Sequence, residues 1–147
     1  MQSKNNLFYT TIMKSPEEIV GIMLEKDAFS KWMNLTVHSL GLGYCELSTT
    51  VHAEMLNGFE ILHGGISYSL SDSALAFASN SRGYKCVSIE TSISHIRPAK
   101  LGDVLTAKAK EMHRGRTTGI YEVEITNQEN KLISLFKGTV HISQDCW

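Results

Sequence analysis

The chain has 147 residues, which suits one domain with a substantial core and is too short for two. Its 14 Lys and Arg residues nearly balance its 15 Asp and Glu residues, so the net charge of -1 gives no bulk attraction to nucleic acid or to an anionic membrane. We therefore expect a single domain over residues 1–147 that binds neither.

Three cysteines, Cys45, Cys86 and Cys146, lie far apart in the sequence and form no CxxC pair. They fit a reducing compartment better than a disulfide framework or a zinc site. The first residues lack the long apolar core of a secretory signal, and no stretch approaches the ~20 apolar residues that a membrane helix needs. We expect a cytoplasmic protein.

The first predicted element is a short helix within an N-terminal extension of about residues 1–34. Ser15 is a good N-cap, Pro16 suits the first helical position, and two acidic residues follow in the first turn. The apolar stripe behind them predicts a helix that reaches about Trp32.

From Leu35 the period of the pattern changes. Residues 35–42 and 44–52 are predicted as two strands with glycines between them, and residues 53–62 as a loop.

The central prediction is one long helix from Gly64 to about Ser81, in which nearly every second residue is Ser or Ala. A surface helix has one polar and one apolar face, whereas this one is small and almost uncharged on all sides. We therefore expect it to be buried on all sides. Its one charged residue, Asp72, has no cation three or four positions away. A buried carboxylate without a partner is costly, which makes Asp72 a candidate functional residue.

The start of this helix, His63-Gly64-Gly65, contains none of the residues that cap helices best. Its first N–H groups are therefore expected to lack a side-chain acceptor, and glycines let a ligand approach the backbone. Such an open helix N-terminus suits an anion or a developing oxyanion. Two glycines that merely make a tight turn are the alternative.

After Gly83 the pattern predicts strands almost throughout. Apolar and polar residues alternate in residues 87–94, 104–113 and 121–125, and a turn at residues 127–130 leads into a last predicted strand over residues 131–142. Two of these strands have one solvated face, which argues for antiparallel pairing. The sum is an α+β domain, with a curved antiparallel sheet wrapped around the long central helix.

Several motifs occur in the order found in one known family. The chain resembles the hotdog-fold thioesterases of the phenylacetate-pathway (PaaI) group over about residues 51–141, and the ordered set of motifs is specific. The matching segments are Val51–Gly58, His63-Gly64-Gly65, Leu70-Ser71-Asp72, Asn80–Gly83, Arg97-Pro98-Ala99, Gly102-Asp103 and Gly119–Ile125.

This resemblance implies a hotdog fold and the hydrolysis of acyl-CoA thioesters to free acid and CoA. It also implies an aromatic, phenylacetyl-type acyl group and a homodimeric site, often within a tetramer built as a dimer of dimers. No cofactor is expected, because CoA is part of the substrate.

The resemblance also assigns roles to individual residues. Asp72 takes the place of the catalytic carboxylate, either as nucleophile or as general base, and the sequence does not separate these. The Gly65 N–H would hold the carbonyl oxygen, and Asn57 would orient the water or the thioester. His63 has either a structural or a direct part. Asn57 followed by Gly58 is alternatively just a turn signal.

Helix geometry gives an independent reason to expect a dimer. Gly65 and Asp72 are seven residues apart, which is about 10 Å along a helix axis. One thioester carbon cannot lie within reach of both groups, so two subunits related by a two-fold axis would have to share each site. Alternatively, one of the two residues is idle.

Two basic groups lie at predicted strand ends, where they could meet the phosphates of CoA. Solvated charges at turns are the equal alternative. Together with the helix-start glycine, the predicted substrate-binding residues are Gly64, Arg97, Pro98, Lys100, Arg114, Gly115 and Arg116.

Other chemistries fit less well. The helix start lacks the final glycine of the GxSxG motif of serine hydrolases, and the six histidines show no HExxH motif or close ligand pairing, so no metal site is expected. A hotdog hydratase or dehydratase, with His63 and Asp72 as its acid–base pair, is the nearest enzymatic alternative. A non-catalytic acyl-CoA-binding module is the non-enzymatic one, although binding alone does not require Asp72.

Overall fold

The structure is a computed structural model that describes residues 13–147. Its elements, in chain order, are α1 (Pro16–Glu25), α2 (Ala28–Trp32), β1 (Thr36–Gly41), β2 (Tyr44–Thr50), the 3-10 helix η1 (Ala53–Met55), α3 (Gly64–Asn80), β3 (Tyr84–His95), β4 (Val104–Arg114), β5 (Thr118–Thr126) and β6 (Leu132–Cys146).

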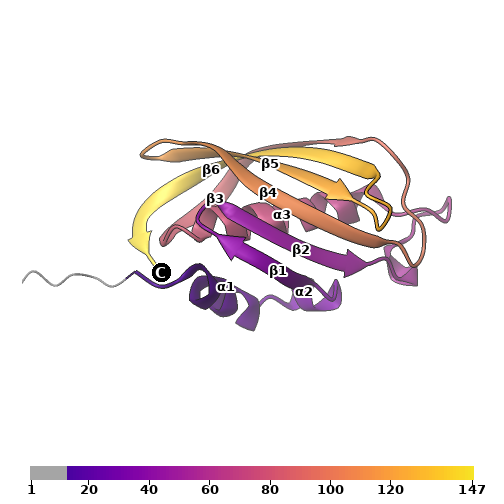
Figure 1. The fold of residues 1–147 in the computed structure, drawn as a ribbon, viewed down its shortest axis with the longest axis horizontal. Helices are drawn as coiled ribbons and strands as arrows, with labels where there is room; N and C mark the ends of the chain where they lie inside the picture. Colours follow the sequence, from indigo (N-terminus) through magenta and orange to yellow (C-terminus); the bar gives the residue numbers. More distant parts are fainter. Residues whose placement is uncertain (1–12) are drawn as a thin grey trace, which may run out of the picture.

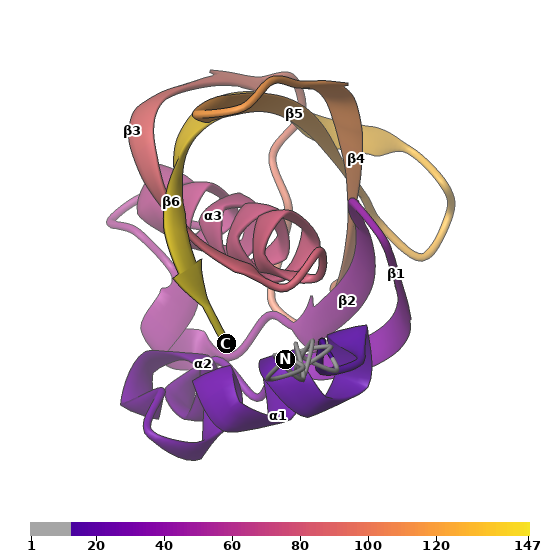
Figure 2. The ribbon, with the colours of Figure 1, turned by 90° about the vertical axis from the view of Figure 1, so that its left-hand side faces the viewer.

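One antiparallel sheet holds six strands in the order β1-β2-β4-β5-β6-β3. The sheet curves around α3 (Figure 1), and the view along the helix shows strands on three sides of it (Figure 2). This is the hotdog fold, and it confirms the predicted α+β architecture and the predicted central helix.

The inner face of the sheet owes its shape to small side chains on β4. Leu105, Ala107 and Ala109 alternate with lysines and threonine along this strand and are fully buried against α3. On the neighbouring β5, Tyr121 and Val123 are also fully buried. Alternating inward and outward residues on both strands confirm the predicted period of two.

The last strand is longer than predicted. β6 continues past Ile142 because its end pairs with the start of β3, where Cys146 lies opposite Tyr84. Pairing with a segment that is distant in the sequence thus extends β6 beyond residue 142, where the predicted strand ends.

The expectation that α3 is buried on all sides is wrong along one stripe. Ala74 and Ala78 are fully buried, but Tyr68 is 37% exposed and Asp72 is only partly buried. The exposed stripe lies beside β3, because Cys86, Val87 and Ser88 of that strand line the cavity at Asp72.

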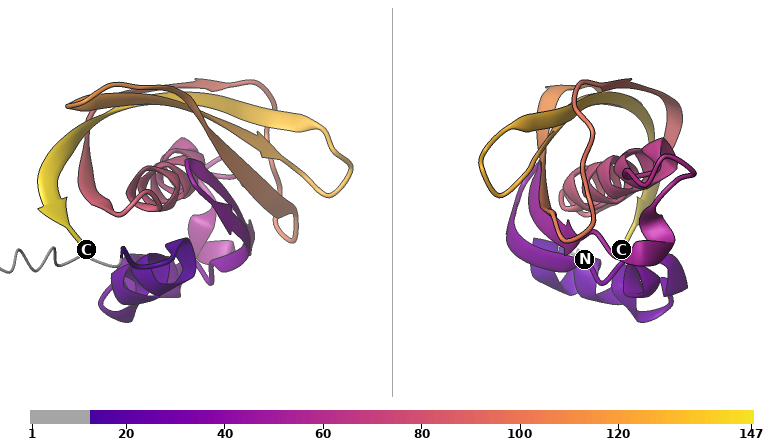
Figure 3. Two further views of the ribbon diagram at one scale, coloured as in Figure 1. Left: turned by 60° about the vertical axis from the view of Figure 1, so that its left-hand side comes forward. Right: turned by 90° about the vertical axis from the view of Figure 1, so that its right-hand side faces the viewer.

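The single N-terminal helix predicted to reach Trp32 is also wrong, because the chain forms two helices there. The Asp27 side chain accepts a hydrogen bond from the Ser30 N–H at 2.9 Å and so caps a new helix, α2. Both helices lie beneath α3, on the side that the sheet does not cover (Figure 3). Residues 13–34 of the predicted N-terminal extension therefore pack on the fold.

The close packing of α3 yields a test of its enclosure. Ala74→Leu or Ala78→Leu should overpack the interior and lower the free energy of unfolding by ~1–3 kcal/mol. Ala28→Leu at an exposed position of α2 is the matched control and should be close to neutral. Denaturant midpoints measure the difference, and neutral results at both buried positions would contradict an enclosed helix.

Candidate active site

The N-terminal end of α3 opens into a cavity of about 410 Å³. Gly64 and Ser67 of α3 line it, together with Asn57 from the loop before the helix and His95 from the end of β3. The rest of the wall is largely aliphatic and includes Ile133 of β6. The cavity combines a helix N-terminus with an apolar wall, an arrangement common in small-molecule sites.

Asp72 lies in a second cavity, of about 240 Å³, farther along the same helix. Ser88 and Cys86 of β3 and Leu75 of α3 are among the residues around it. Asp72 is eight positions after Gly64, which places the two residues about 12 Å apart along the helix axis. Within this chain Gly64 and Asp72 therefore belong to two separate cavities.

The Asp72 carboxylate is only partly buried, and within residues 13–147 no basic side chain forms an ion pair with it. Burial raises its pKa above the ordinary value, while the neighbouring Ser88 hydroxyl acts in the opposite direction. A carboxylate with a raised pKa is a better proton acceptor when ionised, which suits a general base.

The start of α3 differs from the expectation that its first N–H groups lack a side-chain acceptor. His63 is the N-cap, and its Nδ1 accepts a hydrogen bond from the Gly65 N–H at 2.9 Å. An imidazole can cap a helix in this way although it is not among the preferred capping residues. The predicted oxyanion donor, Gly65, therefore already has a partner.

Gly64 is the glycine that remains available. In the described part of the chain, its N–H donates no hydrogen bond, and the residue lines the first cavity. A side chain could not stand here without moving its neighbour, because a Cβ on Gly64 would lie 3.0 Å from His95 Nε2. The backbone is thus open to a ligand at Gly64 rather than at Gly65.

The position of Asn57 is consistent with both roles that the sequence left open, a turn residue and a residue that faces the substrate. Its Oδ1 accepts from the Phe59 N–H at 2.9 Å and so forms the predicted turn. It also lines the cavity beside Gly64. Because only Oδ1 is used in the turn, the two Nδ2 hydrogens are available to a ligand.

The first predicted basic group lies next to this cavity. Arg97 and Pro98 line it and also line a neighbouring cavity of about 290 Å³ that includes Lys100. The Arg97 Nη1 donates to the Leu132 carbonyl at 2.8 Å, which holds the side chain against β6.

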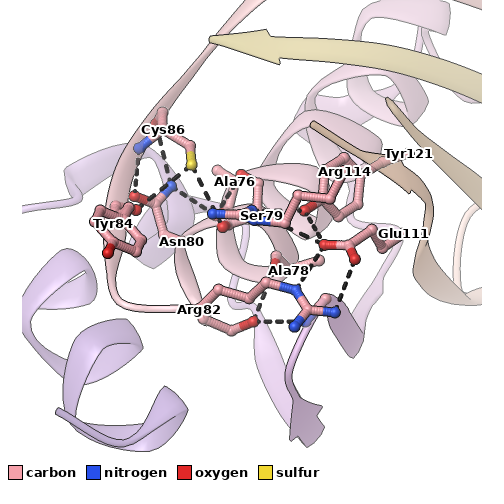
Figure 4. Close-up of polar contacts among 12 residues, drawn as sticks. Ala76, Ala78, Ser79, Asn80, Arg82, Tyr84, Cys86, Glu111, Arg114 and Tyr121 are labelled. Atoms are coloured by element: carbon pink, nitrogen blue, oxygen red, sulfur yellow. Dashed lines mark hydrogen bonds and ion pairs between the residues drawn. The ribbon is translucent and has the colours of Figure 1, made fainter. Parts of the chain in front are cut away.

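The second basic group lies away from Gly64, in a cavity of about 470 Å³ lined by Arg114, Gly115 and Arg116. The Arg114 guanidinium, 17% exposed, turns inward to the Tyr121 hydroxyl and the Glu111 carboxylate (Figure 4). Within one protomer the structure does not bring the two basic groups together. The internal contacts favour a structural part for Arg114.

Two residues at the site escaped the sequence analysis. His95 lines the Gly64 cavity and Ser88 lines the Asp72 cavity, and both belong to β3. Polar residues are expected on the solvent face of a strand, so nothing in the local pattern distinguished them. Their proximity to α3 arises only from the curvature of the sheet.

The described residues show two further features. Nowhere in residues 13–147 do three or more His, Cys, Asp or Glu side chains come together as metal ligands could. The helices of this range are also too short or too polar to cross a membrane.

Comparison with known proteins agrees with the fold. Residues 59–134 match the sequence profile of the Thioesterase superfamily. The acyl-coenzyme A thioesterase PaaI of Escherichia coli is 42% identical over 119 residues, which cover 81% of this chain and 85% of that protein.

Solved structures give the same relationship. The E. coli PaaI protein from the phenylacetic acid degradation operon superposes with a TM-score of 0.87 at 38% identity, covering 89% of this chain and 95% of that one. A hypothetical thioesterase from Streptococcus pneumoniae, solved with coenzyme A, gives a TM-score of 0.75 at 31% identity, covering 78% of this chain and 89% of that one.

The family model and these relatives define the class of this protein as a hotdog-fold thioesterase. The chain belongs to the Thioesterase superfamily, which confirms the resemblance and the expectation of a thioester hydrolase.

The capping role of His63 can be separated from a chemical one. His63→Ala removes the acceptor of the Gly65 N–H and should lower the free energy of unfolding by ~1 kcal/mol. His63→Asn restores an acceptor and should recover both stability and thioester hydrolysis. Denaturant unfolding and a hydrolysis assay on the same samples measure both. A stable but inactive Asn variant would contradict a purely positional role.

Proposed function

We propose that this protein hydrolyses acyl-CoA thioesters in a site shared by two subunits. The observation that carries the proposal is that Gly64 and Asp72 lie on one helix but open into different cavities. The relatives whose names include acyl-coenzyme A or coenzyme A support CoA as the thiol portion of the substrate.

The edge strand β3 supports the shared site. It lies at the end of the sheet, and Val87 and Ile89 on it are 64% and 60% exposed. A long exposed edge with apolar side chains invites pairing with another strand. Antiparallel pairing with a second β3 would extend the sheet across a two-fold axis and produce a homodimer.

This pairing would also bring together the two cavities, which we call half-sites because each would supply part of one active site. His95 at the end of β3 belongs to the Gly64 cavity, whereas Ser88 near its start belongs to the Asp72 cavity. In an antiparallel pair, the end of one strand lies beside the start of the other. The Gly64 cavity of one protomer would therefore meet the Asp72 cavity of its partner, twice in each dimer.

In the shared site the Gly64 N–H would donate a hydrogen bond to the carbonyl oxygen as negative charge develops on it, at the positive end of α3. We assign this role to Gly64 in place of Gly65, whose N–H is bound to His63. Asn57 Nδ2 would orient the thioester or the water.

Asp72 would act in one of two ways. As general base it removes a proton from water, whose oxygen adds to the carbonyl carbon; the C–S bond then breaks and the thiolate takes up that proton. As nucleophile it adds to the carbonyl carbon, the C–S bond breaks, and an acyl anhydride and the CoA thiolate form; water then hydrolyses the anhydride, which restores the Asp72 carboxylate, yields the acid and supplies the proton that the thiolate takes up. Either route yields the free acid and CoA and needs no cofactor.

We further propose an aromatic acyl group of the phenylacetyl type. The largely aliphatic wall of the Gly64 cavity suits an apolar acyl group, and the phenylacetic acid operon of the E. coli relative supports the aromatic class. Assembly of two dimers into a tetramer remains a prediction from the resemblance.

Replacing the carboxylate tests the chemistry. Asp72→Asn should lower the turnover of phenylacetyl-CoA by ~10²–10⁴-fold.

The same variant also tests the burial of the charge. Since the folded-state pKa of Asp72 is raised, its charge destabilises the fold at neutral pH, and this destabilisation disappears as the pH falls through that pKa. The variant should therefore be at least as stable as the parent at pH 7, with the difference shrinking at acid pH. CoA release and thermal unfolding measure both effects. Near-normal turnover would exclude Asp72, and hydration of an enoyl-CoA without CoA release would favour a hydratase.

Subunit mixing tests the shared site. Asn57→Ala and Asp72→Ala should each be nearly inactive alone. Because Asn57 is beside Gly64 and Asp72 would serve the partner's site, a hybrid dimer has one doubly damaged site and one intact site. Random exchange makes half of the dimers hybrids, so activity should recover to about a quarter of the parent value.

The control mixes Asn57→Ala with Asn57→Ala/Asp72→Ala, which cannot form an intact site. Mass spectrometry verifies that subunits have exchanged. No recovery after verified exchange would mean that each site is built within one chain.

A further inference from the structure

The turn after Asn57 holds Phe59 in a fixed position. The Asn57 N–H donates to the Ile61 carbonyl at 2.8 Å, and the Glu60 N–H donates to the Asn57 carbonyl at 3.0 Å. The Asn57 Oδ1 accepts from the N–H groups of Phe59 at 2.9 Å and Ile61 at 3.4 Å. The turn is thus closed by backbone and side-chain hydrogen bonds, and Phe59 occupies its tip.

The Phe59 side chain is 86% exposed, more than any other large apolar side chain in the described residues. Burial of a phenyl ring is strongly favourable in water. A defined turn that holds such a ring in solvent, next to a candidate catalytic residue, therefore indicates that something covers the ring in the working complex.

The turn belongs to the Gly64 cavity. Asn57 and Ile61, on either side of Phe59 in the sequence, both line it together with Gly64. The loop that carries them projects from the fold at the end where α3 begins (Figures 1 and 3). Phe59 is thus held at the same end of the molecule as the free Gly64 N–H.

The cavity lacks other side chains that would select an aromatic ring. Apart from the imidazole of His95, the described residues that line it contribute no aromatic ring, and its apolar side chains, which include Ile61, Ile96 and Ile133, are aliphatic. Aliphatic walls accept any apolar acyl group of suitable size, whereas aromatic rings favour one another beyond the area they bury.

We propose that Phe59 is a specificity-determining residue whose ring packs on the acyl group of the bound thioester and favours acyl groups that end in an aromatic ring. The inference rests on the proposed acyl-CoA hydrolysis and assigns part of its specificity to one side chain. It gives Asn57 a second task, because the amide that faces the substrate also holds the turn under Phe59.

The test compares kcat/KM for phenylacetyl-CoA and for acetyl-CoA in four proteins: the parent, Phe59→Ala, Phe59→Tyr and Leu42→Ala. In Phe59→Ala, the value for phenylacetyl-CoA should fall about 2- to 10-fold more than the value for acetyl-CoA. Phe59→Tyr keeps an aromatic ring and should keep the parent ratio. Leu42, 63% exposed in the β1–β2 turn, is the matched control, and its truncation should leave the ratio unchanged.

Sedimentation of each protein accompanies the kinetics. An equal fall for both substrates in Phe59→Ala, or no fall for either, would overturn the specificity role. A weakened dimer whose hydrolysis and parent ratio return at high protein concentration would make Phe59 a subunit contact instead. If the parent hydrolyses neither thioester, the proposed function itself fails and this inference fails with it.

Discussion

The structure depends on the close approach between α3 and the sheet. A Cβ added at Gly138 of β6 would lie 2.5 Å from a Leu75 methyl group, so any larger residue at this position would require the Leu75 side chain to move. Ala74 and Ala78 leave room for the neighbouring strands in the same way. This packing explains the unusual composition of α3, because larger side chains would push the sheet away. The helix is therefore held as a rigid rod, and the groups at its ends keep a fixed separation.

That rigidity determines what the two half-sites can do. A fixed spacing of about 12 Å between Gly64 and Asp72 prevents both from acting on one bond within a protomer. The open stripe of α3 and the exposed edge of β3 provide the surface that a partner would cover. Incomplete enclosure of the helix, which differs from the sequence-based expectation, is thus what leaves the Asp72 carboxylate partly exposed.

The far end of α3 is held by polar contacts instead. Arg82, just beyond the helix, donates to Glu111 at 2.7 and 2.8 Å, and the Tyr121 hydroxyl donates to the same carboxylate at 2.7 Å (Figure 4). Burial alone would raise the pKa of Glu111, but these donors lower it. Below that pKa the carboxylate is neutralised, so this contribution to stability is present near neutral pH and lost in acid. Arg114 belongs to this group through its contacts with Tyr121 and Glu111.

The sequence by itself determined the central helix, the alternating strands and the unusual position of Asp72 as the one charge on that helix. Each of these follows from the local composition or from the spacing of apolar residues. It also carried the ordered motifs that match the Thioesterase superfamily. Only the tertiary structure decided which glycine N–H is available to a ligand. The His63 side chain accepts the hydrogen bond of the Gly65 N–H, and no residue pattern predicts that side-chain conformation. His95 and Ser88 likewise became site residues only when the sheet curved them onto α3. Local interactions can be predicted from a sequence, whereas contacts between distant segments depend on how the sheet curves around its helix.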